Sequence, residues 1–259
     1  MDAAETPAQR GVTLAAAMPP TISVLERGWV SSNNILLFDH EDSATLIDTG
    51  YVAHNAQTLQ LVRHALNGRK LAQVINTHLH SDHCGGNALL KRELGATIVI
   101  PHGHADAVAS WDQDKLGYSA CGQACERFMY DALIEPGQRI SIGSTEWQAF
   151  ASPGHDPDSI VLWNARDRTL ISADALWQHG FGAIFAEVEG RSGFAEQRAI
   201  LQLMRELEPQ HVIPGHGAPF TDVEAAFERA FDRLDALEAT PERNARHVIK
   251  TLIKVHLLN

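Results

Sequence analysis

The sequence has few cysteines: Cys84, Cys121 and Cys125 are the only three among 259 residues. A small, odd number does not indicate a disulfide framework, so we expect reduced thiols and a reducing compartment, the cytoplasm. Cys121 and Cys125 are one helical turn apart, and two free thiols on one helix face are the simplest expectation. Cys84 follows a histidine-rich stretch, where we expect a small buried side chain rather than a ligand.

A long hydrophobic run is also missing. No apolar segment approaches the roughly 20 residues that a membrane helix needs, which predicts no membrane partner. Residues 10–18 faintly resemble a signal peptide, but the segment is short, and Asp2 and Glu5 precede it. We therefore expect residues 1–20 to form a poorly ordered N-terminal tail.

Positive charge is scarce as well. The chain has 21 Lys and Arg against 32 Asp and Glu, which gives a formal net charge of -11. Nucleic-acid binding depends on clustered Lys and Arg, so no nucleic-acid partner is expected. The rest of the composition, 44% hydrophobic and 20% charged, is typical of a globular protein with one large domain or two.

What the sequence does contain is a dense histidine cluster. His78, His80, Asp82 and His83 fall within six consecutive positions, after the strand-like residues 71–75 and before two glycines. His78 and His80 project from the same side of an extended chain, whereas the other two follow once the chain has begun to turn. Burying so many polar groups without a metal or hydrogen-bond partners is costly. The cluster therefore predicts metal binding, and two adjacent ions are easier to place than one.

Three later stretches each deliver one further His or Asp into a turn marked by Gly or Pro. They present His155, Asp174 and His216, each after a short apolar run. A loop at a strand end is where a rigid scaffold presents functional groups. Each stretch is a weak signal alone, but their order after the histidine cluster makes a strong one.

This series of motifs resembles the metallo-β-lactamase-fold hydrolase superfamily over residues 23–220. The resemblance implies an α/β fold, a four-layer αββα sandwich with pseudo-symmetric halves. It also implies two metal sites: one held by His78, His80 and His155, the other by Asp82, His83 and His216, with Asp174 bridging both.

The alternation of strand-like and helical segments suits such a sandwich. We expect the catalytic domain to span residues 21–220, with a short C-terminal helical extension over residues 221–259. Two helices are expected in this extension, near residues 222–239 and 241–258.

Asp48 ends the strand-like residues 44–47 in an Asp-Thr-Gly sequence that resembles the first motif of the superfamily. The resemblance implies that this aspartate orients the histidine loop, because a metal-bound histidine usually needs a hydrogen-bonded partner on its other nitrogen. An aspartate that merely turns the strand is an equal alternative.

Residues 102–136 are the first segment from which substrate contacts are predicted. Insertions at this position shape a pocket or lid in related enzymes, and Trp111 and Tyr118 are the aromatic side chains expected there. The alternative is a small helical subdomain with an aromatic core. We interpret His102 and His104 as surface histidines, because no acidic residue follows them as in the first cluster.

The second segment follows Asp174. Trp177 and Phe181 are expected to line an apolar pocket, and His179 is expected to bind substrate or protonate a leaving group. A packed loop with an exposed His179 is the alternative.

The ligand set predicts two divalent cations, zinc first, with iron or manganese as alternatives. Two ions bridged by Asp174 would activate a shared water near neutral pH and polarise a carbonyl. Asp82 is expected to orient the nucleophile or pass its proton.

The predicted reaction is hydrolysis of an acyl bond in a small molecule, with a thioester ahead of a lactone or another ester. Residues 190–194 are similar to a Gly-Arg-x-x-Phe stretch of glyoxalase II and persulfide dioxygenase relatives, which favours thiol-derived substrates. The C-terminal extension is shorter than the one that holds glutathione in glyoxalase II, so glutathione recognition stays open.

Three other interpretations compete with this one. A mononuclear iron dioxygenase acting on a persulfide would use a subset of these ligands, and a non-catalytic metal-binding protein could keep them all. A β-lactamase is less favoured, because Asp174 stands where those enzymes lack a bridging aspartate.

Overall fold

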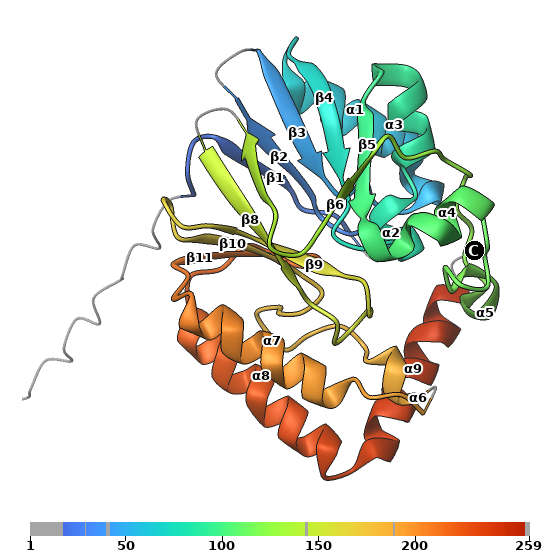
Figure 1. The fold of residues 1–259 in the computed structure, drawn as a ribbon, viewed down its shortest axis with the longest axis vertical. Helices are drawn as coiled ribbons and strands as arrows, with labels where there is room; N and C mark the ends of the chain where they lie inside the picture. Colours follow the sequence, from blue (N-terminus) through green and yellow to red (C-terminus); the bar gives the residue numbers. More distant parts are fainter. Residues whose placement is uncertain (1–17, 29, 40–41, 143–144, 189, 257–259) are drawn as a thin grey trace, which may run out of the picture.

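The computed structural model describes residues 18–28, 30–39, 42–142, 145–188 and 190–256. Two β-sheets lie face to face in it, with helices on the outer side of each (Figure 1). Most of the expected N-terminal tail, residues 1–17, falls outside the described residues.

The first sheet has six strands in the order β1-β2-β3-β4-β5-β6. Strands β1 to β3 pair antiparallel, whereas β3 to β6 pair parallel. Parallel strands end at the same sheet edge, so the loops after β3, β4 and β5 emerge side by side. The strands are β1 (Ile22–Leu25), β2 (Asn34–Phe38), β3 (Ser43–Ile47), β4 (Lys70–Ile75), β5 (Thr97–Pro101) and β6 (Ala132–Ile134).

The second sheet has five strands in the order β11-β10-β9-β8-β7. Strands β10 and β11 are parallel, and the other neighbours are antiparallel. As a result β8, β10 and β11 run in one direction and end at one edge. The strands are β7 (Arg139–Ile142), β8 (Thr145–Ala151), β9 (Ile160–Asn164), β10 (Thr169–Ala173) and β11 (His211–Pro214).

Three buried hydrophobic clusters separate the four layers. The middle cluster joins the inner faces of the two sheets, with Ile75 and Trp147 as members from opposite sheets. A second cluster lies between the first sheet and its helices and includes Leu90, and a third lies between the second sheet and its helices and includes Phe227. This layering confirms the predicted αββα sandwich.

The described residues form helices on the outer faces of the sheets and in the loops that follow the strands. The helices are α1 (Asn55–Leu66), α2 (Ser81–Cys84), α3 (Asn87–Leu94), α4 (Ala105–Ser110), α5 (Tyr118–Cys121), α6 (Phe185–Val188), α7 (Phe194–Glu206), α8 (Val223–Glu238) and α9 (Pro241–His256). Two 3₁₀ turns, η1 (Val52–His54) and η2 (His102–His104), precede α1 and α4.

The two C-terminal helices differ in their packing. Helix α8 packs beside α7 over the second sheet, and its Phe227 is buried there. Helix α9 contacts α8 and α6 and then reaches α5 of the other half (Figure 1). Its buried Asn244 donates a 2.8 Å hydrogen bond to the carbonyl of Ile184, which fixes the helix beside α6.

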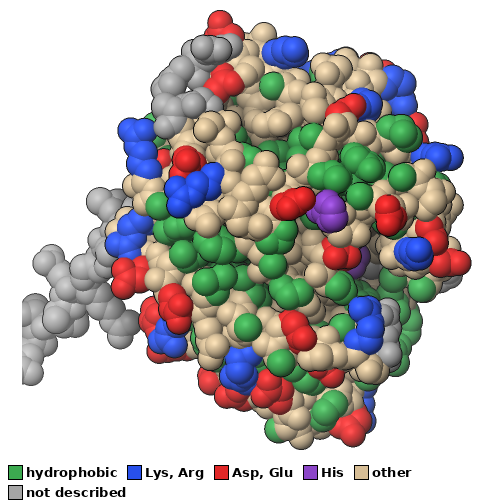
Figure 2. Space-filling model, viewed as in Figure 1, with side chains coloured by type: hydrophobic (Ala, Val, Ile, Leu, Met, Phe, Trp, Pro, Cys, Tyr) green, Lys and Arg blue, Asp and Glu red, His purple; other side chains and the backbone are tan. Residues whose placement is uncertain are grey.

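The surface carries charges of both signs. On the face shown in Figure 2, Lys and Arg are interspersed with Asp and Glu, and hydrophobic side chains gather near its middle. Within the described ranges, no helix combines the length and the apolar character that a membrane span requires.

Candidate metal centre

The predicted ligands stand at the carboxyl ends of strands. His78 and His80 follow β4, and the one-turn helix α2 carries Asp82 and His83. The three ligands from the second half, His155, Asp174 and His216, follow β8, β10 and β11. Because these strand ends meet where the two sheets face each other, the structure brings all seven side chains together.

Two glycines allow the histidine loop to pack closely on the loop after β3. A Cβ at Gly85 would lie 2.5 Å from the backbone nitrogen of Val52, and a Cβ at Gly86 would lie 2.6 Å from the carbonyl oxygen of Thr49. Neither position has room for a side chain, so the glycine pair in the sequence is a packing requirement.

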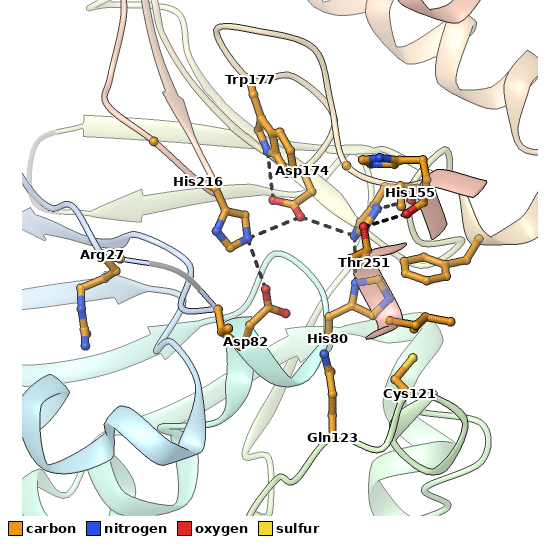
Figure 3. Close-up of a pocket in the computed structure, with 18 residues that line it drawn as sticks. Arg27, His80, Asp82, Cys121, Gln123, His155, Asp174, Trp177, His216 and Thr251 are labelled. Atoms are coloured by element: carbon orange, nitrogen blue, oxygen red, sulfur yellow. Dashed lines mark hydrogen bonds and ion pairs between the residues drawn. The ribbon is translucent and has the colours of Figure 1, made fainter. Parts of the chain in front are cut away.

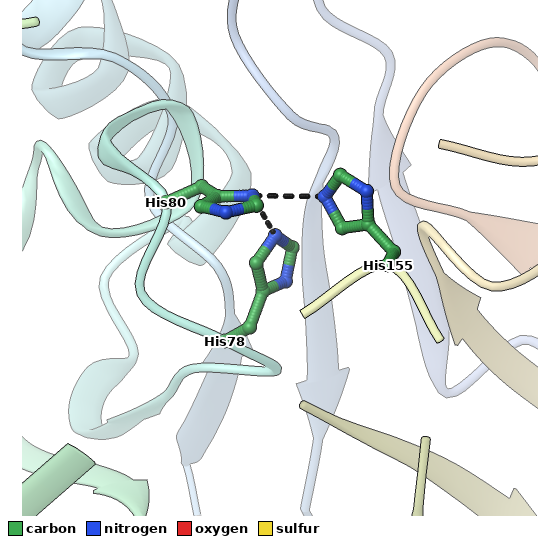
Figure 4. Close-up of side chains that lie close together, drawn as sticks. All are labelled: His78, His80 and His155. Carbon is green, nitrogen blue, oxygen red and sulfur yellow. Dashed lines mark hydrogen bonds between the residues drawn. The ribbon is translucent and has the colours of Figure 1, made fainter. Parts of the chain in front are cut away.

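Three imidazole nitrogens form the first metal group (Figure 4). His80 Nδ1 lies 3.1 Å from His78 Nε2 and 2.8 Å from His155 Nε2. Three nitrogen lone pairs at this spacing suit one cation that takes histidine ligands.

Asp82, His83 and His216 form the second group. Asp174 lies between His216 of this group and His155 of the first (Figure 3). His216 Nε2 is 3.2 Å from Asp82 Oδ2. Asp174 Oδ1 is 3.5 Å from His83 Nε2, and Asp174 Oδ2 is 3.5 Å from His155 Nε2 and 3.7 Å from His216 Nε2. One carboxylate thus faces ligands of both groups, as a bridging ligand must.

Asp48 is hydrogen-bonded to the Nδ1 side of the His83 ring. Its Oδ2 accepts a 2.7 Å hydrogen bond from His83 Nδ1, and its two oxygens also accept bonds from the Thr77 amide and hydroxyl. The other ring nitrogen, His83 Nε2, is buried and has no hydrogen-bond partner among the described residues. Such a nitrogen is costly to bury unless a cation uses its lone pair, so the residues present fit a divalent ion.

The protonation equilibria follow from burial and close packing. Burial, with His155 adding to it, lowers the pKa of His80 to about 4. Burial raises the pKa of Asp174, but His216 and His83 lower it more, so it lies far below its usual value. Burial lowers the pKa of His83, but Asp174 and Asp48 together raise it more, so it lies well above its usual value.

A cavity of about 380 Å³ opens onto the metal groups. Trp177 lies in its wall, with Nε1 donating a 3.2 Å hydrogen bond to Asp174 Oδ1. Phe185 of α6 lies edge-on to His80 and His155, at 5.4 and 5.7 Å between ring centroids. Two aromatic side chains, Trp177 and Phe185, thus lie beside the predicted ligands in the cavity wall.

Helix α9 supplies a part of this wall that the sequence analysis missed. His247, Thr251 and Leu252 line the cavity from one side of the helix. Helical periodicity in a sequence does not tell which partner the apolar side of a helix meets.

Four residues predicted to contact substrate do not line this cavity. Trp111 and Tyr118 pack in the cluster outside the first sheet, and Phe181 is buried in the cluster outside the second. His179 is exposed and is not among the residues that line the cavity. These positions differ from the expected positions in a substrate pocket, because the three aromatic rings pack in hydrophobic clusters instead.

Segment 102–136 does reach the cavity, through Cys121 and Gln123. Cys121 ends α5, so Cys121 and Cys125 do not share a helix face as expected. Cys125 Sγ instead lies 3.9 Å from Cys84 Sγ, and burial raises the pKa of the Cys84 thiol well above its usual value.

His104 also differs from its expectation. It is 7% exposed and contacts Asp156, so it is not a surface histidine. No periodicity or spacing in the sequence places these two residues together, since they come from different sheets.

Residues 27–216 match the sequence model of a family described as the metallo-beta-lactamase superfamily. The match contains Asp48 and all seven predicted ligands. This chain belongs to the metallo-β-lactamase superfamily. It is accordingly a metal-dependent hydrolase.

Two curated relatives and one solved structure illustrate the likeness. A "Probable metallo-hydrolase YqjP" of Bacillus subtilis is 27% identical over 74% of this chain and 69% of that protein. A "Hydroxyacylglutathione hydrolase" of Rhodopseudomonas palustris is 31% identical, but the match covers 46% of this chain and only 39% of that protein. A beta-lactamase domain protein from Burkholderia ambifaria shares the fold with a TM-score of 0.69 at 23% identity, over 87% of this chain and 78% of that one.

Proposed function

We propose that this metallo-β-lactamase superfamily member hydrolyses acyl thioesters of small molecules at a dinuclear metal centre. The position of Asp174 carries the proposal, because its two oxygens face ligands of both groups in the wall of the cavity. A complete second group favours a dinuclear hydrolase over a mononuclear dioxygenase. The hydroxyacylglutathione hydrolases among the relatives support a thioester substrate.

The ligand set suits zinc best, and iron or manganese would accept the same mixture of imidazoles and carboxylates. Cations bound here supply Lewis acidity, which activates water and polarises the acyl carbonyl. His78, His80 and His155 would hold one cation, while Asp82, His83 and His216 would hold the other and Asp174 would contact both.

The remaining steps belong to side chains of the chain itself. Asp82 lies in the cavity wall, where its carboxylate can accept a hydrogen bond from the attacking water and take its proton. Trp177 holds Asp174 in one rotation through its indole hydrogen bond. Phe185 shields His80 and His155 from bulk water on the side of α6.

The cavity favours an apolar acyl group. Val30, Ala183 and Leu252 contribute to its wall, and a volume of about 380 Å³ lies in the usual range for small-molecule sites.

Arg27 also borders the cavity, but its guanidinium donates to side chains of Asn34, Thr58 and Gln57. That guanidinium is therefore already engaged and is poorly placed to bind the carboxylates of glutathione.

Thiol release from a panel of thioesters tests the proposal. The panel contains a lactoyl-glutathione and short and long acyl-coenzyme A, and the protein is loaded with zinc. Asp174→Asn serves as the blank, and Asp232→Asn, an exposed carboxylate on α8, is the matched control. We expect release by the wild type and the control only. No release from protein shown to hold two cations would contradict a thioester substrate and favour lactones or other esters.

A further inference from the structure

Asp156, the residue after His155, lies between two histidines from the other half of the molecule. Its Oδ2 is 3.7 Å from His80 Nε2, and its Oδ1 is 3.3 Å from His104 Nε2. The Asp156 and His104 side chains are each only 9% exposed. A buried carboxylate in this position requires an explanation, because an ionised group is costly to bury without partners.

The two nitrogens of His80 face different groups. Nδ1 points to His78 and His155 in the three-histidine group (Figure 4), and Nε2 faces the Asp156 carboxylate. A neutral imidazole that offers one nitrogen to a cation carries its proton on the other. The Nε2–H group of His80 is therefore the donor. Its nitrogen lies 3.7 Å from Asp156 Oδ2, so a movement of less than an ångström forms a hydrogen bond.

The Asp156 carboxylate is itself held in place. Its Oδ1 accepts a 2.8 Å hydrogen bond from the backbone nitrogen of Asp158. The same oxygen faces His104, which stands in η2 directly after β5. The loop is docked tightly on this turn, since a Cβ at Gly103 would lie 1.9 Å from Asp158 Oδ1.

We propose that Asp156, supported by His104, is a positioning residue that orients the His80 ring and strengthens cation binding by the three-histidine group. A carboxylate behind a metal-bound imidazole fixes its tautomer and its orientation and raises its basicity. Asp156 would act on the three-histidine group only, because its described contacts do not reach Asp82, His83 or His216. The inference rests on the metal centre of the proposed function, but not on the choice of a thioester substrate.

Cation binding without substrate provides the test. The two stepwise zinc affinities are measured by competition with a chromophoric chelator, and the cobalt-loaded protein gives an absorption spectrum that reports ligand geometry. For Asp156→Ala we expect one affinity to fall by roughly 10- to 100-fold, the other to stay, and the cobalt bands to shift. Asp156→Asn keeps an acceptor oxygen but loses the charge, so its loss should be smaller.

Asp232→Asn is the matched control, because it makes the same change on an exposed side chain of α8 that does not line the cavity. Both affinities and the cobalt spectrum should remain those of the wild type. His104→Gln should weaken the same affinity as Asp156→Ala, and it should have no further effect in the Asp156→Ala background, because His104 acts through Asp156.

Native affinities and a native cobalt spectrum in folded Asp156→Ala would overturn the inference. If that variant does not fold, Asp156→Asn, which has nearly the same size, decides by the same two measurements. An equal loss of both affinities would also overturn it. Failure of the wild type to bind two cations would refute the metal centre itself, whereas missing thioesterase activity with normal cation binding would refute only the proposed substrate.

Discussion

Trp177 and Asp174 are joined by a hydrogen bond from the indole Nε1 to the carboxylate Oδ1, 3.2 Å long (Figure 3). The bond fixes the rotation of the carboxylate, so that Oδ2 faces His155 and His216. The indole ring also lies 5.5 Å from the His216 ring, between centroids. Trp177 therefore both lines the cavity and fixes the orientation of Asp174, the proposed bridging ligand.

Replacing Trp177 by Phe keeps an aromatic ring but removes this hydrogen bond. A hydrogen bond to a charged group contributes about 1.5–3 kcal/mol, so we expect kcat to fall by roughly 10- to 100-fold. Trp163→Phe is the matched control, because Trp163 is buried on β9 away from the cavity. Unchanged kcat in Trp177→Phe would show that the indole does not position Asp174.

Removing His216 should empty mainly the second group. His216 Nε2 lies near Asp82 and Asp174, whereas the three-histidine group has its own nitrogens. We expect His216→Ala to bind close to one zinc per chain, measured by elemental analysis after gel filtration. The exposed His179→Ala serves as control and should keep two zinc ions and full activity. Two retained zinc ions in His216→Ala would remove His216 from the ligand set.

Asp48→Asn tests the residue behind His83. Asp48 has φ of 57°, a left-handed conformation that Asn tolerates, so the backbone should keep its shape. The amide keeps one acceptor but loses the charge opposite His83 Nδ1. We expect the affinity for the second zinc ion to fall by roughly 10- to 100-fold, measured by chelator competition. An unchanged affinity would favour the alternative in which Asp48 only turns the strand.

Local sequence predicts each ligand-bearing loop, because each follows an apolar strand and precedes a turn residue. The family resemblance implied that these loops meet, and the strand directions bring them to one place. Asp48 shows the limit of such local reasoning: the sequence left two roles open, and its distance to His83 favours one of them.

The cavity wall could not be predicted in the same way. Trp111 and Tyr118 stand in a segment of the right kind, yet their rings are drawn into the core beside Phe128. Leu252 reaches the cavity only because α9 crosses from α8 to α5. Such contacts depend on how distant elements pack, which neither periodicity nor spacing encodes.

Removing the metal should destabilise the fold. A ligand that binds only the native state at 100 times its Kd adds about 2.7 kcal/mol to the free energy of unfolding. For a chain of this size that corresponds to a fall in Tm of roughly 5–11 °C on chelation, measured by scanning calorimetry. Asp174→Asn, which should bind the cations weakly, is expected to show a much smaller fall. An equal fall in both proteins would mean that the chelator acts elsewhere.

Leu252 and Ile253 offer a matched pair for testing the cavity wall on α9. Leu252 lines the cavity, whereas the next residue, Ile253, is 54% exposed. Leu252→Trp should fill part of the space for the acyl group, so kcat/KM should fall roughly tenfold or more for long acyl chains and less for short ones. Ile253→Trp adds the same bulk on the solvent side and should leave the chain-length profile unchanged. If the two variants gave the same profile, α9 would not contact the acyl group, and the acyl chain would have to lie against other lining residues such as Val30 and Trp177.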